Sequence, residues 1–206
     1  MSNKLQTLDS IQTLGGDRKE GPQDSVKKEY QEGLRFLEQL EYGQAAVALH
    51  NALVGYEQSQ DETGIANASN QLGHVCLFRN EYQAALKHYQ RALVVVEMAN
   101  DRMSTLAVLN KIVTAQKGLK KYDKAIAACF DMLDLYQDNR DPQGTIVTLE
   151  AMAEIYLDDG QKAKAADAYK AIGSIHKNFR HDTMAAQYLE KATQLGTVAA
   201  NGSSSL

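Results

Sequence analysis

Small and apolar residues recur along the chain at helical spacing, most clearly between residues 69 and 96. One helix face is marked by residues at i, i+3, i+4 and i+7: Ser69, Leu72, Gly73 and Cys76. A polar turn at 79–81 follows, and a second stripe then begins: Tyr82, Ala85, Leu86, Tyr89, Ala92, Leu93 and Val96. This pattern predicts two antiparallel helices that pack closely through small residues.

The same pattern returns when the sequence is shifted against itself by forty residues. The aligned positions hold Tyr42, Tyr82, Tyr122 and Lys162, and three residues later Ala45, Ala85, Ala125 and Ala165. Other aligned sets are Asp61, Asp101 and Asp141, and Gly64, Ser104 and Gly144. A fixed period of this length is the signature of a repeat architecture, in which neighbouring units share a continuous core.

Each unit is predicted to contain two helices. The pairs are expected near 24–39 and 42–58, 62–79 and 82–99, 102–118 and 122–138, and 142–158 and 162–178. The aspartates at 61, 101 and 141 stand where helix N-caps belong, and Pro142 suits a first helical position because no amide is needed there. A ninth helix near 182–195 lacks a partner after it, as expected for a helix that covers the open end of a solenoid.

The predicted fold is all-α, a right-handed α-α superhelix of four helix pairs with a C-terminal capping helix. The solenoid is expected over 22–195, with units near 22–60, 61–100, 101–140 and 141–180 and the cap at 181–195. Residues 1–21 and 196–206 are expected to be a flexible segment and a flexible tail.

The repeats resemble the tetratricopeptide-repeat family. The matching positions in the first two units are Gly33, Phe36, Tyr42, Ala45, Leu49 and Ala52, and Gly73, Cys76, Tyr82, Ala85, Tyr89 and Ala92. The third unit departs from the pattern, and the fourth keeps only part of it. The forty-residue length is similar to the lengthened repeats of cell-polarity adaptors, motor light chains and bacterial peptide-sensing regulators. The resemblance implies that the repeated small residues are scaffold and that the first helices line a concave groove.

The candidate site is the stripe on the first helices beside their buried seam. Its residues are Lys27, Tyr30, Leu34, Asn67, Asn70, His74, Asn110, Thr114, Lys117, Glu150 and Glu154. Asn70 and Asn110 occupy equivalent positions, and an amide both donates and accepts, which suits the backbone of an extended peptide. In the lengthened repeat families such asparagine ladders hold peptides, and the resemblance implies the same here. The alternative is that two asparagines align by chance on a solvated face.

A second use of the family, a basic clamp for the carboxylate of chaperone tails, is incomplete in this sequence. Tyr30 stands where the first lysine of the clamp is expected, and Ala107 and Val147 occupy later basic positions. The glutamates at 150 and 154, opposed by Lys27 and Lys117, instead predict a groove of mixed sign that orients a ligand.

The composition argues against several functional classes of protein. The 206 residues carry a formal net charge of -4, which argues against a nucleic-acid partner. No stretch reaches membrane-spanning length and no secretory h-region is found, so no membrane contact and a cytoplasmic location are expected. Two widely separated cysteines, Cys76 and Cys129, are expected to be small buried hydrophobes.

No catalytic or cofactor motif is found, and we expect no enzyme activity, cofactor or metal. The five histidines lack metal-ligand spacing, and His50, His88, His176 and His181 are expected to be solvated. The predicted function is an adaptor that binds a peptide or helix of another protein in the groove. The alternatives are a structural homo-oligomer, suggested by Met184, Tyr188 and Leu195 as exposed apolar residues on the cap, or a peptide-sensing regulatory subunit that acts through a separate effector.

Overall fold

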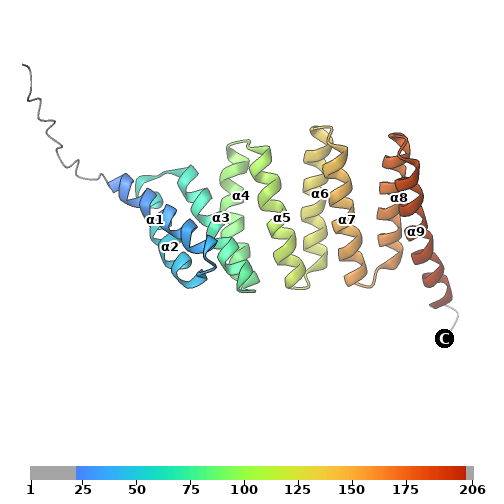
Figure 1. The fold of residues 1–206 in the computed structure, drawn as a ribbon, viewed down its shortest axis with the longest axis horizontal. Coiled ribbons are helices and arrows are strands. Elements are labelled where there is room, and N and C mark those ends of the chain that lie inside the picture. The colour runs from blue at the N-terminus through green and yellow to red at the C-terminus, as the bar shows by residue number, and fades with distance from the viewer. Residues whose placement is uncertain (1–21, 203–206) are drawn as a thin grey trace, which may run out of the picture.

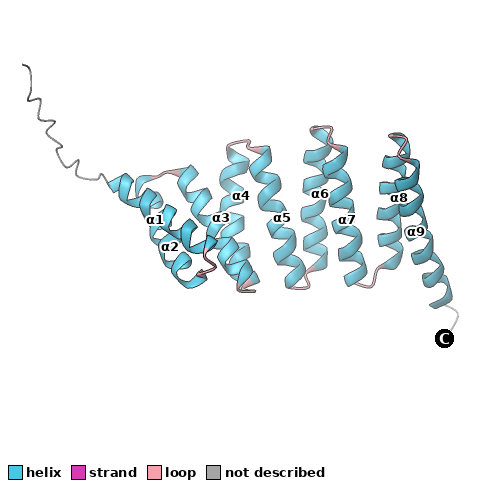
Figure 2. Ribbon diagram, in the orientation of Figure 1, coloured by secondary structure: helices cyan, strands magenta, loops and turns pink. Residues whose placement is uncertain are grey.

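The computed structural model describes the backbone of residues 22–202 and the side chains of residues 23–196. This part of the chain consists of nine α-helices joined by short turns, and it contains no strand (Figure 2). The helices are α1 Pro22–Glu38, α2 Tyr42–Ser59, α3 Glu62–Phe78, α4 Tyr82–Met98, α5 Arg102–Gly118, α6 Tyr122–Asp138, α7 Pro142–Asp158, α8 Lys162–Asn178 and α9 Asp182–Gly202.

The helices form a single row in chain order (Figure 1). Each helix packs against the one before it and the one after it, and α1 also touches α3. The predicted all-α solenoid of four helix pairs with a terminal helix is therefore confirmed. The predicted ends of α1 to α8 differ from the observed ends by no more than two residues.

The repeated aspartates cap the first helices of the second, third and fourth units. The carboxylates of Asp61, Asp101 and Asp141 accept hydrogen bonds from backbone N–H groups three residues later, at 2.9, 3.1 and 2.9 Å. These bonds satisfy amides that the helix itself cannot pair. The second helices begin differently, because Glu41, Glu81, Lys121 and Gln161 make no side-chain cap bond.

Helices α1 to α8 all end in the same way. A residue with a positive φ follows within two residues of each helix end and recurs every twenty residues: Leu40, Gln60, Asn80, Asn100, Lys120, Arg140, Gly160 and Arg180. At the first end, Leu40 N–H donates to Leu37 C=O at 3.0 Å and Glu41 N–H donates to Phe36 C=O at 2.8 Å. This is the Schellman pair of bonds, and the same pair closes the other seven ends. Glycine is favoured at such a position, yet only Gly160 supplies it.

Small residues and large rings pack against each other in the core, as the sequence pattern predicts. The four aligned alanines, 45, 85, 125 and 165, are wholly buried. The ring of Tyr89 is also wholly buried, and a Cβ added at Gly73 would lie 2.6 Å from its Cε1. The close approach of α3 and α4 therefore depends on the absence of a side chain at Gly73.

The predictions for the two ends of the chain can be compared with the structure at the C-terminal end alone. The predicted flexible segment 1–21 lies outside the described residues. Helix α9 continues to Gly202, beyond residue 195, where the sequence analysis ended the cap helix. No proline stops the helix there, and Ala199 and Ala200 are strong helix formers.

Candidate functional site

The predicted site residues lie on the first helices of the four units, α1, α3, α5 and α7. None of the eleven is buried: Lys27, Asn67, Asn110, Thr114 and Glu154 are exposed, and Tyr30, Leu34, Asn70, His74, Lys117 and Glu150 are half-buried. We refer to these eleven residues as the first-helix stripe. At least part of each of these residues is accessible to another molecule, whereas the neighbouring seam residues, such as Ser69 and Leu72, are buried.

Three side chains join α1 to α3 at the N-terminal end of the stripe. Burial raises the pKa of the Tyr30 hydroxyl. A side-chain hydrogen bond between Gln71 and Tyr30 lowers that pKa by a smaller amount. The Oε1 atom of Gln71 also lies 3.2 Å from Nδ1 of His74. Burial, together with the positive charge of Lys111, lowers the pKa of His74, so the imidazole is held neutral. Tyr30, Gln71 and His74 thus form a hydrogen-bonding surface between α1 and α3.

Asn70 lies next to this cluster and has an unused acceptor. Its side-chain oxygen, Oδ1, is buried and has no hydrogen-bond partner within the described part of the chain. An unpaired buried carbonyl costs free energy, and an external donor reaches it only if the Asn70 side chain turns outward. Asn110, the equivalent residue of the next unit, is exposed on α5.

Opposite charges meet at the C-terminal half of the stripe. The Nζ atom of Lys117 lies 3.1 Å from Asp158 and 3.4 Å from Glu154, which joins α5 to α7. Burial works against the charged form, but the hydrogen bonds and charges of these two carboxylates raise the pKa of Lys117. Lys117 is therefore shared between two carboxylates in the free protein.

The other acidic residue of the stripe, Glu150, is bound by the last helix. The Tyr188 hydroxyl donates a hydrogen bond to Oε1 of Glu150. That bond and burial raise the pKa of Tyr188 to about 12. The Nζ atom of Lys191 lies 4.9 Å from the centre of the Tyr188 ring. Helix α9 thus closes the C-terminal end of the stripe through this tyrosine.

Two residues near the last helix correct the sequence analysis. Tyr188 was expected to be an exposed apolar residue of the cap, but it is only 8% exposed because its ring stacks on His176 at 5.5 Å. His176, expected to be solvated, is only 9% exposed for the same reason. The prediction assumed that α9 leaves one face open, whereas that face packs on α8.

The described residues contain few groups suited to metal binding or nucleophilic chemistry. No group of three or more histidine, cysteine, aspartate or glutamate side chains among them could hold a metal ion. Cys129 is buried as expected, Cys76 is half-buried, and burial raises the pKa of both thiols, that of Cys129 to about 11. A thiol with a raised pKa is a poor nucleophile. None of the helices that the structure describes combines the length and apolarity needed to cross a bilayer.

Sequence reasoning missed three residues that shape the stripe: Gln71, Asp158 and Lys191. A signal for the cross-unit pairs does exist. Lys117 and Glu154 are separated by 37 residues and Glu150 and Tyr188 by 38, slightly less than one repeat. This separation brings a residue of one first helix to the same level as a residue on the next.

Similarity to known proteins supports the assignment of the repeat and of the fold. A family model described as tetratricopeptide repeat matches residues 68–103, the stretch that spans most of α3 and all of α4. No curated protein matches the sequence significantly. The match falls on the unit that carries the clearest pattern of small and aromatic residues.

Several solved structures share the arrangement of helices at low sequence identity. The apo form of RapI has a TM-score of 0.69 and 14% identity over 85% of this chain, which spans 64% of the RapI chain. A putative kinesin light chain from P. anserina with nearly identical TPR-like repeats has a TM-score of 0.67 and 11% identity, covering 87% of this chain and 90% of that one. PilF of Pseudomonas aeruginosa has a TM-score of 0.52 and 22% identity, covering 84% and 78%. Residues 68–103 are thus similar to a tetratricopeptide repeat, and the solved structures show that this chain shares their fold.

Proposed function

We propose that the protein is a non-enzymatic adaptor that binds an extended segment of a partner protein along the first-helix stripe. The fold of the family points to a protein–protein interaction role, and repeat proteins of this kind present long surfaces for such segments. The observation that carries the proposal is that Asn70 and Asn110 lie at equivalent positions of α3 and α5, one half-buried and the other exposed. The amide of each both donates and accepts, as binding of a peptide group requires.

Asn110 extends the same recognition to the next unit. Because its amide both donates and accepts, it binds a peptide group regardless of the peptide's side chains. Two such residues fix the path of the backbone, and the rest of the stripe then selects the sequence. The neutral His74 region suits polar or apolar side chains, since the pKa of His74 is lowered by burial.

The charged half of the stripe sets the direction of the peptide. Lys117 and Glu154 pair in the free protein, and a ligand that brings its own charge has to compete with that pair. Such competition discriminates between ligands more than it adds affinity. A segment with a cation near Glu154 and Asp158 and an uncharged stretch near Asn70 fits this arrangement.

The test uses peptides selected from a random displayed library on the wild-type protein, with affinities measured by fluorescence anisotropy. Asn70→Ala/Asn110→Ala removes two amide contacts, each worth about 1 kcal/mol, so affinity should fall by roughly tenfold or more. The matched control, Asn51→Ala/Gln90→Ala, removes two exposed amides from the second helices and should leave affinity unchanged.

Equal affinity for the wild type and the Asn70/Asn110 variant would refute the ladder. Loss of binding in both variants would show that the amides act through stability and not through contact. Circular dichroism melting of each variant separates that effect from binding.

A further inference from the structure

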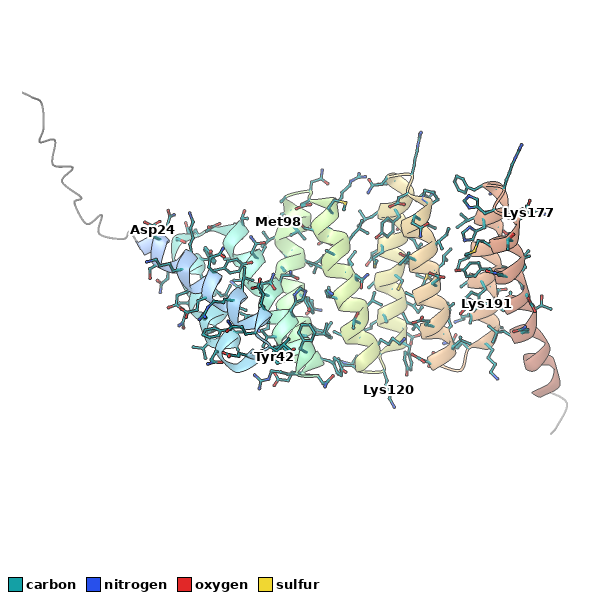
Figure 3. All side chains as sticks on the ribbon, in the orientation of Figure 1. Asp24, Tyr42, Met98, Lys120, Lys177 and Lys191 are labelled. Atoms are coloured by element: carbon teal, nitrogen blue, oxygen red, sulfur yellow. The ribbon has the colours of Figure 1, made fainter. Side chains whose placement is uncertain are left out.

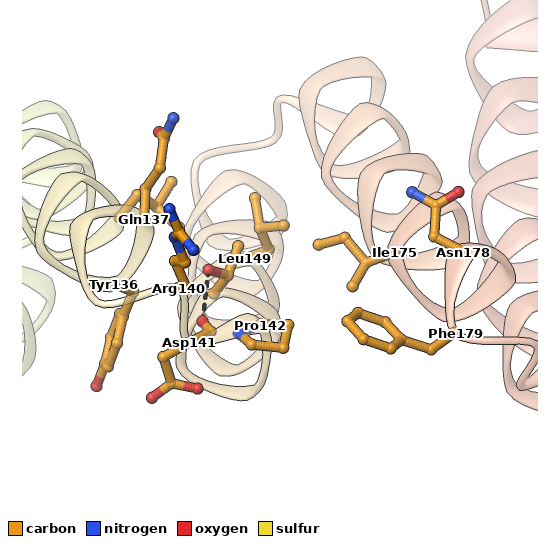
Figure 4. A pocket seen from close by; sticks show the side chains of 11 residues that line it. Tyr136, Gln137, Arg140, Asp141, Pro142, Leu149, Ile175, Asn178 and Phe179 are labelled. Carbon is orange, nitrogen blue, oxygen red and sulfur yellow. Dashed lines mark hydrogen bonds between the residues drawn. The ribbon is translucent and has the colours of Figure 1, made fainter.

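A pocket of about 480 Å³ lies between the second helices α6 and α8, over the N-terminal half of α7 (Figure 4). Its floor and walls are mainly apolar, with Leu133, Leu149, Ile175 and Phe179 among them. Arg140 and Asn178 add polar groups. The pocket shares no residue with the first-helix stripe.

The repeat provides an internal comparison for this pocket. Forty residues earlier, a smaller pocket of about 310 Å³ lies at the equivalent place between α4 and α6. There the guanidinium of Arg102 hydrogen-bonds Asn139 at 3.0 Å and lies 3.5 Å from Asp138. Between α2 and α4, an ion pair joins Arg91 to Glu57. The two earlier junctions are therefore bridged by polar side chains of the protein itself.

The third junction replaces these bridges with apolar groups. Pro142 stands where Arg102 is in the previous unit, and Phe179 stands where Asn139 is. Phe179 is 54% exposed, so much of its ring remains in contact with water. A pocket of this size that is lined by apolar side chains and a few polar groups has the character of a ligand site.

A cation accompanies the apolar lining. Arg140 replaces Asn100 of the previous unit, and no carboxylate of the described residues forms an ion pair with it. The other charged group in the lining, Asp141, is occupied because its carboxylate accepts a hydrogen bond from Gly144 N–H at 2.9 Å. Lys177, beside Asn178 at the same end of α8, adds a second cation to this end of the molecule (Figure 3). Arg140 and Lys177 favour an acidic group on a ligand, and the Asp141 carboxylate beside Arg140 offsets part of that attraction.

We propose that this pocket is a second interaction site, which takes an apolar or aromatic side chain of a partner protein that is flanked by carboxylates. The side chain fills the space between Leu149, Ile175 and Phe179, and a neighbouring carboxylate pairs with Arg140. Because the pocket opens between second helices and shares no residue with the first-helix stripe, a peptide bound to the stripe leaves it free, and one protein can join two partners.

The experiment uses the full chain, labelled with ¹⁵N, and two acetylated, amidated peptides: Gly-Glu-Phe-Glu-Gly and its neutral counterpart Gly-Gln-Phe-Gln-Gly. Backbone amide shifts are followed by NMR during titration. We expect saturable shifts confined to residues 133–149 and 175–179. We also expect roughly threefold weaker binding of the neutral peptide, the effect of one partly exposed ion pair.

Arg140→Ala should reduce the affinity for the acidic peptide to that of the neutral one. Lys120→Ala is the matched control, since it also removes an exposed cation from a turn position with positive φ, and it should change neither affinity. Phe179→Ala should weaken both peptides. The proposal is overturned by shifts spread over other helices, by equal affinity for the two peptides, or by equal effects of the Arg140 and Lys120 variants.

Discussion

The left-handed residues that end the helices allow a quantitative prediction about stability. Lys120 has a φ of 55°, and its side chain projects away from the turn between α5 and α6 (Figure 3). A left-handed conformation costs an L-residue roughly 1–2 kcal/mol, and glycine avoids this cost. Glycine also loses more backbone entropy on folding, about 0.5–1 kcal/mol. Lys120→Gly should therefore raise the free energy of unfolding by about 0.5–1 kcal/mol.

The two Schellman bonds at this end should survive the substitution because both are made by the backbone. Lys120 N–H donates to Lys117 C=O at 2.9 Å, and Lys121 N–H donates to Gln116 C=O at 2.9 Å. Gly160, with a φ of 75°, provides the reverse experiment, and Gly160→Lys should lower the free energy of unfolding by a similar amount.

Urea denaturation followed by circular dichroism measures both changes. The control is Gln90→Gly, in the exposed interior of α4, where the same type of substitution should destabilise by about 1 kcal/mol because the backbone there is helical. Destabilisation by Lys120→Gly, of the size seen with Gln90→Gly, would refute the reasoning. Such a result would mean that the left-handed backbone at Lys120 carries no strain that glycine can relieve.

Three further predictions concern the core, a helix cap and pH. Gly73→Ala should destabilise the protein by about 1 kcal/mol, because overpacking against the buried Tyr89 ring exceeds the gain in helix propensity. Gly43→Ala should stabilise it slightly, because no atom lies within 4 Å of the added Cβ. Thermal melts of the two variants compare these effects directly. Asp61→Ala should cost about 1 kcal/mol in urea melts and Asp61→Asn much less, because asparagine also accepts the cap bond; equal losses would contradict the capping role. The pKa of His74 is lowered in the folded state, so the unfolded state takes up the proton first and stability falls as pH drops below about 6.5, then levels off below the folded pKa. His74→Gln should make this fall shallower in unfolding measurements across pH, and an unchanged slope would contradict the burial of the imidazole.

The regular features of the fold could be predicted because each is repeated in sequence. An alanine at every fortieth residue and an aspartate before three first helices carry the packing and the caps in their own side chains. The Schellman ends could not be predicted in this way. They arise from backbone bonds, and residues such as Leu40 and Lys120 give no local signal for a positive φ.

The site was predicted less completely, because it depends on contacts between units. The stripe itself follows from helix periodicity, and its residues are exposed or half-buried. Its role in binding stays a prediction. The burial of His176 depends on the ring of Tyr188 from the next helix, and the neutralisation of Lys117 depends on Asp158 of the next unit. Only the pairs Lys117–Glu154 and Glu150–Tyr188 become predictable once the cross-unit separation of 37 to 38 residues is known.

The position of α9 at the end of the row makes it easier to open than the internal helices. A terminal helix is held by one interface and an internal helix by two, so α9 should open more often than its neighbours and its amides should exchange with solvent sooner. Each opening would withdraw Tyr188 from Glu150 and leave that carboxylate free on the stripe. Fraying at the C-terminal end would thus free a hydrogen-bond acceptor where a partner segment would lie, and a partner that binds there would compete with the protein's own last helix.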